Sequence, residues 1–217
     1  MTDRDINIVN FIHEVGLATT KNINDLFFSD VSKTVLSRRL NHLVDYNFLK
    51  RIRVKELNNS YMYYIDSKPK HLVHELIGTS FYVALSNLGF NIIRFMRNKK
   101  LGNCIIDIIV IAEINGSEEV FFVEVQRHFN HITKCTDKYK ELYYSNAWKE
   151  VFEDFPKVVV VSDMKYLPRY SEFEVLKIKT DCSDINKLLN LGGIWYVTNY
   201  IMCGTWKFSG WIIHGIR

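Results

Sequence analysis

Hydrophobic positions recur every three or four residues through the first 49 residues of the chain, in three separate runs. The runs are "DRDINIVNFIHEVG" (3–16), "TTKNINDLFF" (19–28) and "SDVSKTVLSRRLNHLVDYNFL" (29–49). This spacing predicts three helices, because apolar side chains three or four residues apart share one helical face. Gly16 is expected to end the first helix, and Thr19 or Thr20 to cap the second.

Two short runs rich in β-forming residues follow, "LKRIRVKEL" (49–57) and "YMYYID" (61–66). The cluster "NNS" between them is typical of a turn, so the runs are predicted to pair as a hairpin. Three helices followed by a hairpin is the order of a winged helix-turn-helix domain, which we assign to residues 1–66.

The third predicted helix has an apolar side and a polar, cationic side. Its apolar side carries Leu36, Leu40, Leu43 and Val44. A helix of this kind can enter the major groove of double-stranded DNA, while a cationic hairpin contacts the phosphates. Arg38 and Asn41 are the strongest candidates for contacts with base edges, and Arg39 is expected to lie against the core or reach a phosphate. The predicted DNA-binding residues are Lys33, Ser37, Arg38, Asn41, Lys50, Arg51, Arg53 and Lys55. Winged helices also serve as protein-interaction modules, and that alternative stays open.

After a connector at "DSKPKH" (66–71), the pattern changes to one helix followed by strands, which we assign to a second domain at 71–217. The helix is predicted in "LVHELIGTSFYVALSNLGF" (72–90), and three strands in "NIIRFMR" (91–97), "NCIIDIIVIAEI" (103–114) and "EVFFVEVQ" (119–126). A helix from about 131 to 148 and a buried strand in "PKVVVVSD" (156–163) come next. This order predicts an α/β/α sandwich on a mixed sheet.

The segment "FFVEVQRHF" (121–129) places a carboxylate and an amide, Glu124 and Gln126, on one face of a strand that otherwise looks buried. Asp107 lies within the apolar run "IIDIIVI", where an unpaired acid is costly to bury. Each of these residues could instead lie at a solvated strand end or pair with a lysine.

With Glu75 on the preceding helix, these acids resemble the PD-(D/E)XK nuclease superfamily. The resemblance implies catalytic roles for Glu75, Asp107, Glu124 and Gln126, with Asp107 and Glu124 binding Mg²⁺ or Mn²⁺. Such an ion would polarise a phosphate and activate a water. Gln126 stands where that superfamily usually has lysine, and Arg127, Lys134 and Lys138 are cations that could compensate.

The two halves together resemble the replication-relaxation family of plasmids, phages and integrative elements. The motifs that carry the resemblance are "LSRRLNHLVDYNFLKRI" with "YMYYID", "CIIDIIVI", and "VFFVEVQRHFNHITKCTDKYKELY". It covers about residues 3–163 and implies a DNA-binding protein that acts in replication or DNA processing. Two function classes remain: a metal-dependent endonuclease, and a non-catalytic regulator or initiator accessory that uses the nuclease-like domain as a scaffold or dimer platform and needs no cofactor.

The composition indicates the class of protein and its location in the cell, but not its function. The 217 residues are 47% apolar and 24% charged, with a net charge of +4, which is typical of a globular protein and too weak alone to indicate nucleic acid. No apolar run reaches the roughly 18 residues that span a bilayer, and "MTDRDINIVN" lacks a signal-peptide layout, so a cytoplasmic protein without membrane contact is expected.

The last part of the chain is predicted to hold a strand in "FEVLKIKT" (173–180), a short helix in "SDINKLLNL" (183–191) and a strand in "GGIWYVTNY" (192–200). Beyond them, Trp206, Phe208 and Trp211 form an aromatic-rich extension. These rings are expected to close the sheet or form a homodimer contact, and stacking on bases is the alternative.

Overall fold

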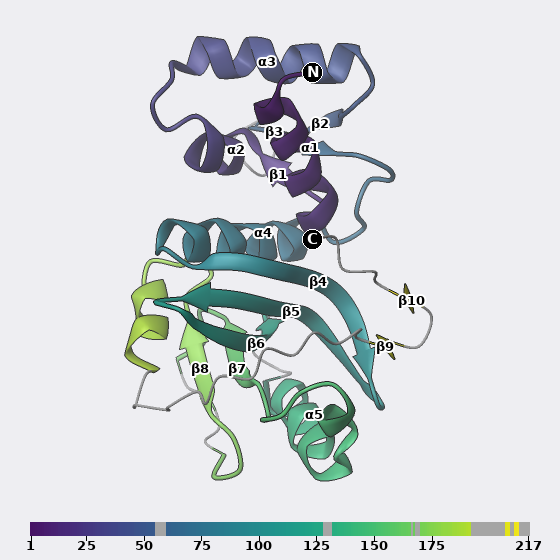
Figure 1. The fold of residues 1–217 in the computed structure, drawn as a ribbon, viewed down its shortest axis with the longest axis vertical. Coiled ribbons are helices and arrows are strands. Elements are labelled where there is room, and N and C mark those ends of the chain that lie inside the picture. The colour runs from purple at the N-terminus through teal and green to yellow at the C-terminus, as the bar shows by residue number, and fades with distance from the viewer. Residues whose placement is uncertain are drawn as a thin grey trace.

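A single helix, α4, separates two structural units of the chain (Figure 1). The computed structural model describes residues 1–54, 60–127, 132–165, 167, 170–191, 207–208 and 211–212. Helices α1 to α3 and a small sheet lie on one side of α4, and a larger sheet lies on the other, with α5 beyond it. In the described residues, no helix combines the length and apolar character needed to cross a bilayer.

The first unit contains the three helices in the predicted places. They are α1 (Asp3–Val15), α2 (Thr20–Phe27) and α3 (Lys33–Asp45). Thr2 caps α1 in a reciprocal capping box with Asp5, and Thr19 caps α2 in the same way with Asn22, because a hydroxyl satisfies an amide that the first turn leaves unpaired. Gly16 ends α1 in the left-handed conformation, as expected.

Three short strands accompany these helices: β1 (Ala18–Thr19), β2 (Lys50–Val54) and β3 (Ser60–Tyr64). They form one antiparallel sheet in the order β1-β3-β2, so the predicted pairing of β2 with β3 is confirmed. The sequence pattern missed β1, because a two-residue strand has no detectable alternation of apolar and polar positions.

The second unit is a mixed sheet of five strands in the order β4-β5-β6-β7-β8. The strands are β4 (Asn91–Leu101), β5 (Cys104–Ile114), β6 (Ser117–Val125), β7 (Lys157–Val161) and β8 (Val175–Ile178). The first three are antiparallel, and the last two run parallel to β6. The predicted mixed α/β architecture is therefore confirmed.

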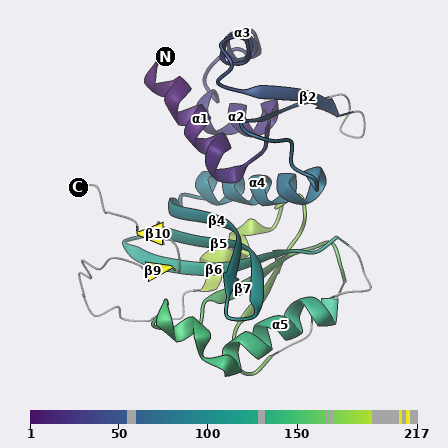
Figure 2. The same cartoon turned by 90° about the vertical axis from the view of Figure 1, so that its right-hand side faces the viewer.

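Helices cover both faces of this sheet, α4 (Leu72–Asn87) on one and α5 (Ile132–Ser145) on the other (Figure 2). The helix predicted to reach residue 148 ends at Ser145, and a short 3-10 turn, η3 (Ala147–Glu150), follows. A second 3-10 segment, η4 (Ile185–Leu191), occupies the place of the last predicted helix.

Part of the predicted aromatic extension lies outside the described residues, including the predicted strand at 192–200 and Trp206. Two short strands, β9 (Lys207–Phe208) and β10 (Trp211–Ile212), form an antiparallel pair within it. The role of its aromatic side chains stays a prediction.

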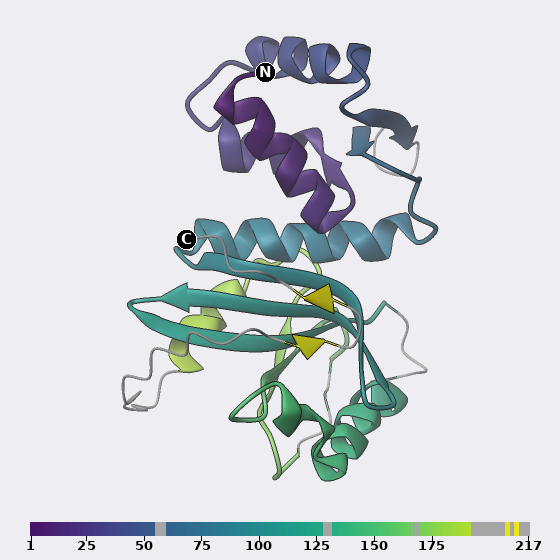
Figure 3. The same ribbon diagram turned by 45° about the vertical axis from the view of Figure 1, so that its right-hand side comes forward.

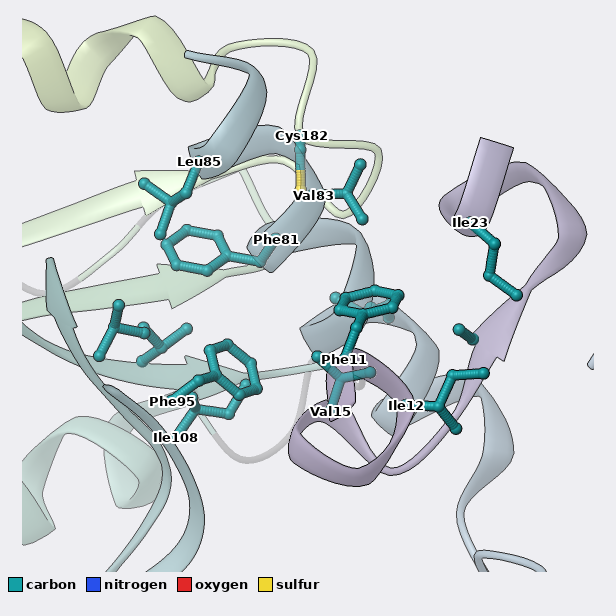
Figure 4. Close-up of a cluster of buried hydrophobic side chains, with 14 of the residues drawn as sticks. Phe11, Ile12, Val15, Ile23, Phe81, Val83, Leu85, Phe95, Ile108 and Cys182 are labelled. Atoms are coloured by element: carbon teal, nitrogen blue, oxygen red, sulfur yellow. The ribbon is translucent and has the colours of Figure 1, made fainter. Parts of the chain in front are cut away.

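One hydrophobic core runs from the first unit through α4 into the sheet. Phe11 of α1 contacts Tyr82 of α4, which in turn contacts Phe95 of β4, and both ring pairs have centroids 5.2 Å apart. Figure 4 shows side chains from α1, α2, α4 and the sheet within this cluster. A second core on the opposite face packs α5 against the sheet, with Phe122 and Tyr139 fully buried.

Polar contacts reinforce the junction between the units at the end of α1. The hydroxyl of Thr79 on α4 donates to the Leu17 carbonyl at 2.6 Å, and Arg97 on β4 donates through Nε to the Glu14 carbonyl at 3.1 Å. The Arg97 guanidinium lies against Gly16, where an added Cβ would be 2.1 Å from its Nη1. The predicted boundary at residues 66–71 therefore does not interrupt the packing.

We expect Gly16→Ala to destabilise the fold more than Gly116→Ala does. The two glycines have φ values of +81° and +79°, but at Gly116 no atom of the described residues lies within 4 Å of an added Cβ. The control should lose about 1 kcal/mol of unfolding free energy from backbone strain. Gly16→Ala should lose an additional 1–3 kcal/mol, because the Arg97 contacts must shift. Urea denaturation measures both changes, and equal losses would show that the Arg97 contact contributes nothing.

Candidate functional site

The candidate acidic site lies where β5 separates from β6. The ladder between these strands ends at Ile108 paired with Val123, so Asp107 and Glu124 are the next facing positions. Opposite Asp107 on β4, Asn98 takes a left-handed conformation with φ of 51°, which interrupts the regular strand. The Val125 amide donates to Asp107 Oδ2 at 2.9 Å, so the carboxylate takes the place of a missing ladder carbonyl.

Asp107 also contacts His74 of α4, whose Nε2 lies 3.1 Å from Asp107 Oδ2. The hydrogen bond to Asp107 raises the pKa of His74, and burial opposes this only in part. Helix α4 comes close to β5 here, because Gly78 has no side chain and Ile108 lies 2.7 Å from the place of its Cβ. In the sequence alone, His74 could join a site but could not be distinguished from an ordinary polar histidine, although it directly precedes Glu75.

Glu124 is the most buried acid of the set, with an exposed fraction of 6%. Its Oε2 accepts a hydrogen bond from the Tyr139 hydroxyl at 2.9 Å and lies 2.6 Å from Lys138 Nζ. Burial raises the pKa of Glu124 and the nearby Asp107 charge adds to this, whereas Lys138 and Tyr139 oppose it. Lys138 also donates to the Ile105 carbonyl at 2.8 Å, beyond the point where β5 leaves β6. Among the candidate cations whose side chains are described, Arg127 and Lys138, it is Lys138 that pairs with Glu124.

Glu75 makes its ion pair elsewhere, with Arg97 Nη1 at 3.0 Å. It nevertheless lines one small pocket together with His74, Arg97 and Asp107. The pocket has a volume of about 10 Å³, which is close to the space of one water. Glu75 and Asp107 therefore share one pocket, whereas Glu124 is not among the described residues that line it.

Gln126 follows β6 directly, and its backbone amide donates to the Val161 carbonyl of β7 at 3.0 Å. Its side chain is half-buried, and Arg127 beside it is exposed. The side chain of Lys134 lies outside the described part of the chain.

The four acidic-site residues therefore converge only in part. Within the described ranges, no group of three His, Cys, Asp or Glu residues is arranged to hold a metal ion. His74, Arg97 and Lys138 each pair with one predicted acid, which weakens the attraction for a dication. Asp107 and Glu124 each keep one oxygen outside these ion pairs, and Mg²⁺ can bind through two carboxylates if waters complete its shell.

The predicted DNA-binding residues of α3 lie on one exposed surface. Lys33, Ser37, Arg38 and Asn41 are all exposed, and the leucines on the opposite side of the helix are buried. Figure 3 shows that α3 lies on the side of the first unit that faces away from the larger sheet. Among the described residues, Lys33 and Arg38 have no acidic partner.

The cations of β2 flank α3 on one side. Arg51 donates to Asn41 Oδ1, and the guanidinium carbons of Arg51 and Arg53 each lie 4.8 Å from the centre of the Tyr61 ring. Lys50 donates to the Asp66 carbonyl. The predicted contact at Lys55 lies outside the described residues.

Of the two placements expected for Arg39, against the core or at a phosphate, the structure shows the first. Arg39 pairs with the fully buried Asp5 of α1 and donates to the Thr2 hydroxyl at 2.8 Å. Burial alone would raise the pKa of Asp5, but hydrogen bonds from the Thr2 amide and from Arg39 hold it below its ordinary value. Asp5 and Arg39 are 34 residues apart, so no helical spacing could have indicated this pair.

Comparison with known proteins identified no relative. No family model matches the chain, and no curated protein or solved structure is significantly similar to it.

We expect His74 to titrate above the ordinary histidine pKa of about 6.5, and Asp107→Asn to bring its pKa back down. The stabilisation from this ion pair is complete below pH 6.5 and is lost as the pH rises through the raised pKa. NMR titration of the imidazole measures both values. A His74 pKa that is the same in the parent and in Asp107→Asn would contradict the ion pair.

Proposed function

We propose that the chain binds double-stranded DNA through the exposed face of α3, with β2 against the phosphates. The observation that carries this proposal is the pair of exposed cations, Lys33 and Arg38, without acidic partners among the described residues. Unpaired cations can release counterions from DNA, whereas a cation already paired with a carboxylate gains less. The buried leucine side of α3 holds this face rigidly outward.

The contacts of α3 also indicate how the two base-reading candidates differ. Asn41 Oδ1 already accepts a hydrogen bond from Arg51, so its amide group is left to donate. Oδ1 keeps a second lone pair, so Asn41 can still make a bidentate contact with adenine, but Arg51 competes for this oxygen and restricts the orientation of the amide. Arg38 has no such constraint, and we assign it the stronger contact, to the O6 and N7 atoms of guanine.

The element order α1-β1-α2-α3-β2-β3 supports the winged-helix interpretation. A winged helix can instead bind a protein through the same face, and the DNA-binding test below separates the two. The motif resemblance to the replication-relaxation family adds the proposal that the chain acts in the replication or processing of a mobile element. A non-catalytic regulator or initiator accessory would need only the DNA-binding face.

We expect the double variant Lys33→Ala, Arg38→Ala to bind duplex DNA at least 10-fold more weakly than the parent. Its slope of log affinity against log salt should be shallower by about 1–2, because each lost phosphate contact removes about 0.9. Fluorescence anisotropy with a labelled duplex at several salt concentrations measures both quantities. Lys187→Ala is a control for the loss of one surface cation away from α3, because Lys187 belongs to η4 and pairs with Asp184. Equal weakening in the control, or no binding by the parent, would contradict the proposal.

Cleavage of the bound DNA is a second candidate function, and the contact of Lys138 with Glu124 favours it. The ammonium lies 2.6 Å from the carboxylate and restores the cation that Gln126 lacks. Burial alone would lower the pKa of Lys138, but Glu124 holds it above its ordinary value, so the side chain is charged at neutral pH. In this proposal Asp107 and Glu124 hold Mg²⁺, which polarises the phosphate and activates a water, and Lys138 offsets negative charge.

If cleavage occurs, supercoiled DNA with Mg²⁺ or Mn²⁺ should be nicked by the parent and not by Asp107→Asn or Lys138→Met. The variants should lose at least 100-fold in rate, a loss typical for a group that stabilises transition-state charge. Glu118→Gln is the control, because Glu118 is an exposed acid at the other end of the β5–β6 hairpin. Nicking that persists in both site variants would eliminate this centre, and no nicking by the parent would favour the non-catalytic alternative.

A further inference from the structure

A groove beside α3 is not used by the proposed contacts of its outer face. It lies between the start of α1, the residue that follows α2, and one side of α3, and its volume is about 530 Å³. Its described lining consists of Thr2, Arg4, Phe28, Val35, Arg38, Arg39 and His42. The β2 cations contact α3 through Asn41, whereas the groove borders Val35, Arg38 and His42, so the two features flank the helix on different sides.

The described lining of the groove has an excess of positive charge. It contains three arginines and no acid. Among the acids that the structure describes, Asp5 alone compensates one of them, and it lies behind Arg39 in the buried ion pair. Arg4 and Arg38 have no acidic partner among the described residues, so two guanidinium groups can meet a ligand.

The walls of the groove are held in place before any ligand arrives. Arg39 ties α3 to Asp5 and Thr2 at the start of α1, and the Arg4 guanidinium lies 4.9 Å from the centre of the Phe28 ring. A guanidinium stacked on an aromatic ring loses less freedom when it binds an anion.

His42 adds a further donor to this side of α3. Its Nδ1 is buried and has no hydrogen-bond partner in the described part of the chain. A buried N–H without a partner costs more than an unpaired acceptor, so the neutral ring favours a proton on Nε2. His42 can therefore present an N–H donor to an anion in the groove.

We propose that this groove binds the phosphates of one DNA strand while the outer face of α3 lies in the adjacent major groove. This inference rests on the proposed function. The major groove is about 12 Å wide and has a phosphate backbone on each side, so a helix inserted in it can be stabilised by cations on both of its flanks. The β2 cations supply one flank, and Arg4 with His42 supplies the other. Arg38 belongs both to the outer face and to the groove, which makes the two surfaces continuous.

The test compares Arg4→Ala, Arg4→Lys and the Lys187→Ala control in the same anisotropy titrations. Arg4→Ala should weaken duplex binding about 3- to 10-fold and reduce the salt slope by about 0.9, the loss of one phosphate contact. The preference between two duplex sequences should stay unchanged, because phosphate contacts carry no base information. Arg4→Lys should recover part of the affinity. Both positions are exposed, so the three variants are expected to fold.

The outcomes separate this inference from the proposed function. If the α3 double variant weakens binding but Arg4→Ala behaves like Lys187→Ala, the groove inference is overturned and the proposed function stands. If the parent does not bind duplex DNA, both fail. A changed sequence preference in Arg4→Ala would overturn the phosphate assignment.

A second arm tests a free phosphate ion as the alternative occupant. Inorganic phosphate is titrated into the protein without DNA, and the guanidinium Nε–H signals of Arg4 and Arg38 are followed by NMR. Weak shifts that do not saturate below about 10 mM are expected. A free phosphate ion contacts the groove alone, whereas a duplex also binds α3 and β2 at the same time. Saturation at low millimolar phosphate, together with a duplex affinity that Arg4→Ala leaves unchanged, would assign the groove to a small anion instead.

Discussion

Helix α4 is buried on both sides, and the positions of both candidate surfaces depend on this packing. Phe81 and Leu85 are fully buried, and the aromatic series Phe11, Tyr82 and Phe95 crosses the helix from α1 to β4. Because interiors of this kind are close-packed, the two units cannot shift relative to each other without losing these contacts. The face of α3 and the acids at the end of the β5–β6 ladder are therefore held in one fixed arrangement.

The same helix gives the acidic site its present character. His74 and Glu75 lie in the first turn of α4, where one contacts Asp107 and the other pairs with Arg97. Lys138 belongs to α5, on the opposite face of the sheet, and pairs with Glu124 from there. Removing His74 or Lys138 would leave the carboxylate of Asp107 or Glu124 poorly solvated and without its partner, which would destabilise the fold. These ion pairs account for the buried acids in structural terms, so DNA binding is the better supported part of the proposed function and cleavage is the second candidate.

Much of the architecture could be predicted from the sequence because it depends on local patterns. Apolar spacing located α1 to α5, and the apolar strands and the Gly116 turn located the sheet. Helix α5 was predicted three residues too long, since the turn at Ala147–Glu150 continues the apolar pattern after the helical hydrogen bonds have ended.

The site was less predictable, because its contacts join residues that are distant in the chain. Asp107 stood out as an acid in an apolar strand, and Glu124 as its neighbour on the next strand. The partners of these acids could not be singled out: Lys138 was one of three candidate cations and His74 looked like an ordinary polar histidine, because only the fold brings their helices to the acids. Arg39 shows the same limit, since its buried partner Asp5 lies on another helix, where no spacing rule relates the two.

The most direct test of the account is to map backbone amide shifts by NMR while a duplex is added to the protein. The account predicts that the largest shifts follow residues 33–41 of α3, with smaller ones at β2 and at the start of α1. Amides of β7 and β8, on the far side of the sheet, should not move. If the amide signals of α3 do not shift, or if the shifts concentrate on the sheet around Asp107, the claim that α3 is the DNA-binding element is contradicted.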